Sequence, residues 1–324
     1  MAASVTRPSI PPAMLDRLIV LLLGCLRWLA ADTASRLGGS LGVAAFHLGV
    51  RRKVASSNVG TALGMTGTAR RDVVRTSYAS IGASFIELWT AGGVDGIDRH
   101  LQVLAPTWLS AVLRRNPGCV FVTPHIGNWD IAGFAIAREA PRVLVYAKAQ
   151  HNPTVDAAAN AQRVGMGIGL LFANHGDRTA AVKALRAVKA GAPLGLLADQ
   201  GPGEREGVRA VFMGVTTYCH GGPGFFAKRA GVPIIPGFCL RTRAGEFVFL
   251  IGRPLASTAG DEAALVQVSM DLIAAMIARF PRQYFWQHRR FKNDLARHER
   301  AVEPWKIHGL SLFADPLKAL PAKA

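Results

Sequence analysis

The chain has 324 residues, of which 50% are hydrophobic, and it carries 38 Lys and Arg against 21 Asp and Glu, a formal net charge of +17. This length and composition exclude a disordered chain, and the mean hydropathy of +0.22 is high for a freely soluble protein. A basic surface attracts polyanions. A basic surface together with apolar segments favours an anionic membrane surface over nucleic acid as the partner, so we expect no nucleic-acid binding.

The N-terminal segment begins with residues 1–13, which are rich in Pro and Ala, and continues into an apolar run from Leu18 to Leu26. A membrane-spanning helix needs about 20 apolar residues, so this run is short for a span. We expect an uncleaved, membrane-associated helix within residues 1–34. A cleaved secretory signal is the alternative, because Ala30 and Ala31 follow a short apolar core.

Two more helices are expected over residues 35–50 and 69–90, the second from apolar residues at helical spacing. The basic run Arg51-Arg52-Lys53 ends the first helix and is assigned to a membrane-facing surface, with an ordinary exposed helix end as the alternative. The run from Gly38 to Gly42 matches the G-x-S-x-G pattern of a nucleophile elbow. Since no β-strand precedes it, close packing of helices is the favoured interpretation.

From residue 117 onward, short β-rich runs alternate with helical stretches. Expected strands cover residues 119–123, 143–146, 168–172, 194–197, 234–240 and 247–251; expected helices cover 131–139, 155–164, 177–191 and 263–277. This alternation predicts an α/β fold, with a mainly parallel sheet flanked by helices, in a domain over residues 35–300. A peripheral tail over 301–324 follows. Active sites of such sheets collect at the carboxyl ends of the strands.

The strand over 119–123 leads into His125, and Asp130 lies five residues later at the start of a helix. On a continuous helix these positions point to different faces, so the side chains meet only if Gly127 and Asn128 fold into a turn. Asp130 then accepts from one imidazole nitrogen, and the other nitrogen takes a proton from an alcohol. Amides at the helix N-terminus are candidates to stabilise an oxyanion.

Spacing alone does not decide the role of His125, because His151 and Asp156, and likewise His298 and Glu303, are also five residues apart. Neither of those pairs follows an apolar strand. The alternative for His125 is a buried histidine bonded to a backbone carbonyl. Four widely spaced cysteines, without a CxxC pair or a Cys/His cluster, favour a reduced, cytosol-facing protein, and we assign no metal.

The segment from Thr123 to Asp130 resembles the HxxxxD/E motif of the bacterial lipid A late acyltransferases (the lauroyl and myristoyl transferases) and of their relatives that acylate phosphatidylinositol mannosides. Further matches follow in the family's order, and together they cover roughly residues 36–294: Asn152-Pro153 with Asp156, Leu196–Gln200, Val208 to Gly214, Gly231–Pro236 and Pro281–Lys292. Two positions depart from the family's pattern. Lys148 stands where the family often has an arginine, and Met213 replaces the second Phe of a Phe-Phe-Gly pattern.

This resemblance implies that residues 35–300 form an acyltransferase domain. It also implies that an acyl carrier protein or coenzyme A donates a fatty acyl chain to a hydroxyl of a membrane glycolipid, with no other cofactor. By the same resemblance, His125 and Asp130 are expected to form the catalytic pair. The expected acceptor is a lipid A precursor in lipopolysaccharide biosynthesis, at the cytoplasmic face of a bacterial inner membrane; a phosphatidylinositol mannoside or a lysophospholipid is the alternative.

The candidate substrate-binding residues are Gly127, Asn128, Lys148, Asp199, Gln200 and Arg289. For Asp199 the alternative is an aspartate that bonds its own turn, and for Arg289 an exposed helix end. Two other classes of function are weighed. A lipid esterase, acting through Ser40 or through water activated by His125, releases free fatty acid without an acceptor. A non-catalytic binder that uses only the basic charge shows salt-sensitive affinity without acyl chemistry.

Overall fold

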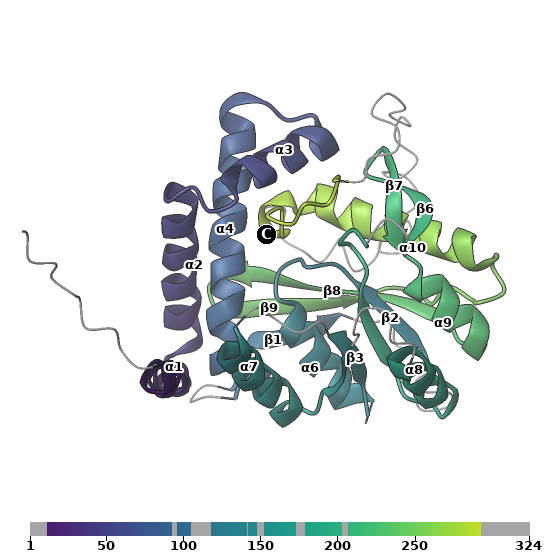
Figure 1. Ribbon diagram of the computed structural model, residues 1–324, viewed down its shortest axis with the longest axis horizontal. Helices are drawn as coiled ribbons and strands as arrows, with labels where there is room; N and C mark the ends of the chain where they lie inside the picture. Colours follow the sequence, from purple (N-terminus) through teal and green to yellow (C-terminus); the bar gives the residue numbers. More distant parts are fainter. Residues whose placement is uncertain are drawn as a thin grey trace, which may run out of the picture.

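The computed structural model describes residues 12–92, 96–104, 118–140, 142–147, 152–172, 179–202 and 207–292. Four helices come first and an α/β domain follows (Figure 1). These helices are α1 (Pro12–Leu26), α2 (Ala31–His47), α3 (Arg52–Leu63) and α4 (Gly67–Thr90). The tail predicted over 301–324 lies outside the described residues. Within them, no helix combines the length and the apolar character that a membrane crossing needs.

The domain is built on a seven-stranded sheet in the order β1-β9-β8-β2-β5-β3-β4. All neighbouring strands in it run parallel except β8 and β9, which pair antiparallel. The prediction of a mainly parallel sheet flanked by helices is therefore confirmed. The strands are β1 (Leu101–Leu104), β2 (Val120–Thr123), β3 (Leu144–Ala147), β4 (Gly169–Phe172), β5 (Leu194–Leu197), β8 (Ile234–Arg243) and β9 (Glu246–Ile251).

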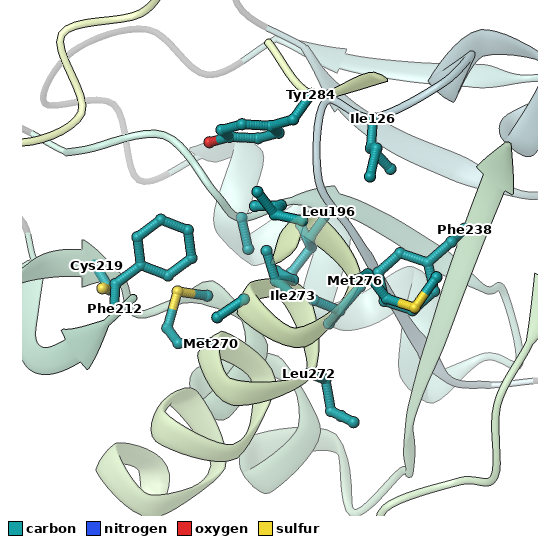
Figure 2. Close-up of a cluster of buried hydrophobic side chains, with 14 of the residues drawn as sticks. Ile126, Leu196, Phe212, Cys219, Phe238, Met270, Leu272, Ile273, Met276 and Tyr284 are labelled. Atoms are coloured by element: carbon teal, nitrogen blue, oxygen red, sulfur yellow. The ribbon is translucent and has the colours of Figure 1, made fainter. Parts of the chain in front are cut away.

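The two faces of the sheet bury different sets of side chains, as the alternation of β2 illustrates. Phe121 points to the face covered by α6 (Trp129–Glu139), whereas Val120 and Val122 point to the opposite face. That opposite face is covered by α8 (Thr179–Lys189), α9 (Gly222–Ala230) and α10 (Glu262–Arg279). Figure 2 shows α10 with Met270, Ile273 and Met276 in this core, near Phe238 of β8.

The sequence patterns missed α3, α9, β1 and a separate antiparallel hairpin, β6 (Gly207–Phe212) with β7 (Val215–His220). The two residues between β6 and β7, Met213 and Gly214, both have positive φ angles, +52° and +77°. Two such residues form the type of tight turn whose twist suits a β-hairpin. Met213 therefore departs from the family's pattern at a turn position.

Helices α2 and α4 lie side by side in Figure 1, and glycines bring their backbones together. A Cβ atom added at Gly42 would lie 1.9 Å from the carbonyl oxygen of Tyr78, and one at Gly82 would lie 2.2 Å from that of Gly38. Ser40 is exposed, and its hydroxyl donates to the Arg36 carbonyl one turn earlier. The packing interpretation of Gly38 to Gly42 is confirmed, and the nucleophile-elbow alternative is wrong because Ser40 sits inside a helix.

Candidate active site

The loop between β2 and α6 carries His125 and is fixed by Gly127 and Asn128. Gly127 adopts φ +55°, and a Cβ there would lie 1.9 Å from the carbonyl oxygen of Cys239. Asn128 is the N-cap of α6, since its side chain accepts hydrogen bonds from the backbone N–H groups of Asp130 and Ile131. The predicted turn is therefore present, and it sets where β2 ends and α6 begins.

The partner of His125 is Asp199. Nδ1 of His125 lies 2.8 Å from Oδ1 of Asp199, whose side chain is 1% exposed against 20% for the histidine. The two residues meet because β2 and β5 are parallel neighbours. Thr123 pairs in register with Leu197, and His125 and Asp199 each follow two residues beyond that pair. Both side chains thus lie at the carboxyl edge of the sheet, where the fold predicts a site.

The expectation that Asp130 is the hydrogen-bond partner of His125 is wrong in this structure. Asp130 instead accepts from Arg163 of α7 (Pro153–Gly165), with Nε at 2.7 Å from Oδ1 and Nη2 at 3.4 Å from Oδ2. The reason is helical geometry, because successive residues are turned by about 100° around an α-helix. Trp129, the first residue of α6, faces His125, and Asp130, the next one, faces α7.

The electrostatics of the pair keep Asp199 ionised. Burial by itself raises the pKa of Asp199, but the charge of His125 and its hydrogen bond to the carboxylate, together with the nearby Tyr284 hydroxyl, bring that pKa below its ordinary value. A carboxylate only accepts hydrogen bonds, so Nδ1 of His125 is the nitrogen that carries a proton toward Asp199, and in the neutral form of the ring the lone pair is on Nε2. The histidine is therefore oriented as a base whose Nε2 receives the next proton.

Three more side chains surround the imidazole. The Trp129 ring stands edge-on to it, with centroids 5.0 Å apart, and the Phe285 ring lies at 6.0 Å. The amide nitrogen of Gln200 is 3.4 Å from both ring nitrogens, which places it beside the ring rather than in line with either one. These contacts restrict the orientation of the His125 imidazole ring.

An apolar pocket lies between α6 and the sheet; its lining reaches Trp129 next to His125 but does not include His125 or Asp199 themselves. Its empty volume, including the open mouth, is about 530 Å³. Trp129 lines the pocket and also contacts His125, and the ion pair of Asp130 with Arg163 lies on the same wall. Most of the remaining lining is apolar or glycine: Phe121, Ala132, Gly133, Ile136, Val143, Val145, Ile168, Gly195, Leu197, Gly237 and Phe249. Such a pocket suits a hydrocarbon chain.

Almost the whole chain matches a known protein family. Residues 4–293 match the model of a family described as bacterial lipid A biosynthesis acyltransferase. The chain belongs to this family. It is an acyltransferase, as the resemblance of the sequence motifs predicted.

This acyltransferase also resembles proteins named phosphatidylinositol mannoside acyltransferase. One from Mycolicibacterium smegmatis is 25% identical over 232 residues, which cover 71% of this chain and 76% of that protein. Two from strains of Mycobacterium tuberculosis, CDC 1551 and H37Rv, are each 26% identical over 193 residues, which cover 60% of this chain and 60% of theirs. The match therefore spans less than two thirds of the M. tuberculosis proteins.

Only some of the other predicted site residues of the acyltransferase contact His125. Asp199 and Gln200 contact His125, whereas Gly127 and Asn128 are buried in the framework beneath it, and Asn128 is 0% exposed. Arg289 is exposed at the surface. Lys148 lies outside the described residues. Sequence reasoning missed Trp129 and Arg163, although Trp129 belongs to the HxxxxD motif that was singled out.

His288, from the family's C-terminal signature, carries a testable consequence of burial. Burial lowers the pKa of His288 from 6.5 to about 4. The charge of Asp199 opposes this shift, and the charges of His125, Arg290 and Lys292 act in the same direction as burial. In the unfolded chain, His288 binds a proton below a pH of about 6.5. In the folded chain it stays neutral until the pH falls to about 4. This contribution to stability is complete above pH 6.5 and is lost as the pH falls toward 4.

We therefore expect the free energy of unfolding to fall less steeply between pH 6.5 and pH 4 in His288→Gln than in the wild-type acyltransferase. Urea unfolding at several pH values measures it, and the difference between the two proteins isolates the contribution of His288. Parallel curves for wild type and variant contradict a buried neutral histidine.

Proposed function

We propose that this acyltransferase moves a fatty acyl chain from a thioester donor to a hydroxyl of a membrane glycolipid. The observation that carries the proposal is the His125–Asp199 pair beside an apolar pocket. The pair supplies a base, the pocket suits the acyl chain, and the acceptor hydroxyl is itself the nucleophile. The logic is that of a hydrolase triad without its serine.

The proposed reaction begins when Nε2 of His125 takes the proton of the acceptor hydroxyl. The oxygen attacks the thioester carbonyl, and a tetrahedral intermediate forms. Asp199 holds the Nδ1 proton and stabilises the imidazolium. As the intermediate collapses, the carbon–sulfur bond breaks and His125 returns a proton to the leaving thiolate, so the products are an ester and a thiol.

Arg163 is our candidate for stabilising the oxyanion. The amides at the start of α6, first considered for this role, are occupied, since Asn128 receives the N–H groups of Asp130, Ile131 and Ala132. The Arg163 guanidinium lies on the pocket wall, and Asp130 holds it by two hydrogen bonds. A fixed positive charge beside the reacting carbonyl stabilises developing negative charge. Asp130 thus acts through Arg163.

Chain-length selection gives the first test of the pocket. Gly195 lies on β5 in the pocket wall, and a Cβ there would stand 3.3 Å from Cγ2 of Val145. We expect Gly195→Val to shift the preference toward shorter acyl donors. Since each buried methylene is worth about 0.8 kcal/mol, losing two of them lowers kcat/KM for long chains by roughly 10-fold relative to short ones.

Competition between donors of different chain lengths measures this ratio. Gly165→Ala is the control, because no atom lies within 4 Å of the added Cβ. An unchanged chain-length profile in Gly195→Val would contradict the proposal that the pocket binds the acyl chain.

The proposed location is the cytoplasmic face of a bacterial inner membrane. Helix α1 exposes Leu18, Leu21 and Leu22, and α2 exposes Leu37 and Leu41. Apolar side chains of this size, next to basic residues, favour a helix lying in an anionic lipid interface. On this proposal the acceptor stays in the bilayer while the site faces the headgroups.

The acceptor is proposed from the comparisons. The family's description favours a lipid A precursor, and the names of the mycobacterial relatives favour a phosphatidylinositol mannoside. Both carry sugar hydroxyls on a phosphorylated lipid, so we propose a phosphoglycolipid as the class. Either an acyl carrier protein or coenzyme A supplies the acyl group; the net charge of +17 favours the acidic carrier protein.

The test presents purified protein with each acceptor in anionic vesicles and with each donor, and mass spectrometry follows the products. We expect an acylated glycolipid with one acceptor class, and none with His125→Ala. Release of free fatty acid without any acylated lipid would support the esterase alternative and end the proposal.

A further inference from the structure

Glu87 and Arg241 form a buried ion pair behind the catalytic loop. Glu87 of α4 has a side chain that is 2% exposed, and Arg241 near the end of β8 has one that is 10% exposed. Nε of Arg241 donates to Oε1 of Glu87 at 2.7 Å, and Nη2 donates to Oε2. Two serines of α4, Ser80 and Ser84, accept from the same guanidinium at 2.9 and 3.0 Å.

The acidic end of this pair continues directly into the loop. Oε2 of Glu87 also accepts from Nδ2 of Asn128 at 2.9 Å, so the carboxylate fixes which end of the Asn128 amide faces it. The other end, Oδ1, then faces the amides of Asp130 and Ile131 and caps α6. The orientation that caps α6 therefore follows from the charge of Glu87.

Two further tethers connect the same network to Gly127. The hydroxyl of Ser84 donates to the Gly127 carbonyl at 2.5 Å. The Gly127 N–H donates to the carbonyl of Gln283, whose side-chain amide bonds both the N–H and the carbonyl of Arg241. Within the described residues, both polar backbone groups of Gly127 are thus bonded to residues that themselves bond Arg241.

We propose that Glu87 and Ser84 are positioning residues for His125, which act through Asn128 and Gly127 without touching substrate. The inference rests on the proposed acyl transfer. A buried ion pair contributes little net stability in general, so its presence is weak evidence for a stabilising role. Here each partner is shared with the loop that carries the base, and a displacement of about 1 Å in such a loop costs roughly 100-fold in rate.

Ser80 and Ser84 provide a matched comparison. Both are buried, both accept one hydrogen bond from Arg241, and only Ser84 bonds the loop. We expect Ser84→Ala to lower kcat by about 10-fold with KM for the acyl donor unchanged, and Ser80→Ala to leave kcat within about twofold of the wild-type value. Equal kcat values in the two variants would contradict the proposal, and unfolding midpoints report whether their stabilities match.

Glu87→Gln tests the charge. One carboxylate oxygen becomes an amide nitrogen that donates, so Arg241 faces a donor in either orientation of the amide, and Asn128 also does when the nitrogen takes the place of Oε2. We expect kcat to fall by about 100-fold. Adding Asn128→Asp restores an acceptor for the new amide and keeps an oxygen over the start of α6. The kcat of the double variant should therefore be at least tenfold higher than that of Glu87→Gln. A double variant no better than Glu87→Gln contradicts the proposed route through Asn128.

A second readout does not depend on acyl transfer. In the full-length protein, the Nδ1 proton of His125 that bonds Asp199 should give an NMR signal, which we expect to shift or broaden in Ser84→Ala and Glu87→Gln but not in Ser80→Ala. An inactive wild type with this pattern would reject the proposed function and keep the positioning role. An active wild type whose signal and kcat are insensitive to Ser84→Ala and Glu87→Gln would reject the positioning role alone.

Discussion

Asp199→Asn is expected to lower kcat for acyl transfer by about three to four orders of magnitude, close to the loss expected for His125→Ala. An asparagine can present an N–H group to Nδ1 of His125, which then holds the imidazole in the tautomer with its proton on Nε2. In the wild-type protein, the Asp199 carboxylate lies 2.8 Å from Nδ1 and stabilises the imidazolium formed during the reaction. The variant lacks this anionic partner. Steady-state kinetics with a saturating donor measures the effect.

Asp130→Asn is the comparison that separates the structure from the sequence motif. Asp130 holds Arg163 and does not bond His125, so its replacement weakens the position of one cation and leaves the base intact. We expect a loss of about 10- to 100-fold in kcat, smaller than the loss in Asp199→Asn. A larger loss in Asp130→Asn than in Asp199→Asn contradicts the assignment of Asp199 as the partner.

Gly127→Ala is expected to lower the free energy of unfolding by about 2 to 5 kcal/mol. One part of this loss is the strain of a non-glycine residue at φ +55°, and the other is the overlap of the new methyl with the Cys239 carbonyl, 1.9 Å from the ideal Cβ position. Relief requires the loop to move away from β8. Urea unfolding at neutral pH measures the change, and kcat should fall with it because His125 sits in the displaced loop.

Gly231→Ala separates the two causes. Gly231 has a similar backbone angle, φ +69°, but no atom lies within 4 Å of its added Cβ. We expect a loss of only about 1 to 2 kcal/mol there, since strain acts without overlap. Equal losses at the two glycines would show that the contact with Cys239 carries no cost.

The sequence was sufficient for the α/β class and for most strands and helices after residue 117, because each is short, apolar and bounded by turn residues. It was also sufficient to place His125 just beyond the carboxyl end of an apolar strand, β2. Strand β1 was missed because residues 101–104 alternate too briefly to stand out from a loop. Helix α9 was missed because Gly222, Pro223 and Gly224 open it, and these residues usually indicate a turn.

The His125–Asp199 contact was not predicted because it depends on strand order. The sequence contains the information that both residues follow apolar strands, but no local pattern says that β2 and β5 are neighbours, 74 positions apart at the contact. The motif favoured Asp130 because it is close in sequence. Arg163 was missed for a related reason, since its partner belongs to a different helix and nothing within α7 indicates that contact.

Ser84 and Phe85 are consecutive residues of α4 that point to different sides of the helix. Ser84 bonds the catalytic loop, and Phe85 is 59% exposed on the outer surface. A helix with its side chains is about 10 to 12 Å across. If, as proposed, that outer surface rests on lipid, one helix of this width separates the lipid from the loop that carries His125, and the sugar headgroup of an acceptor would be modified while its tails stay in the bilayer.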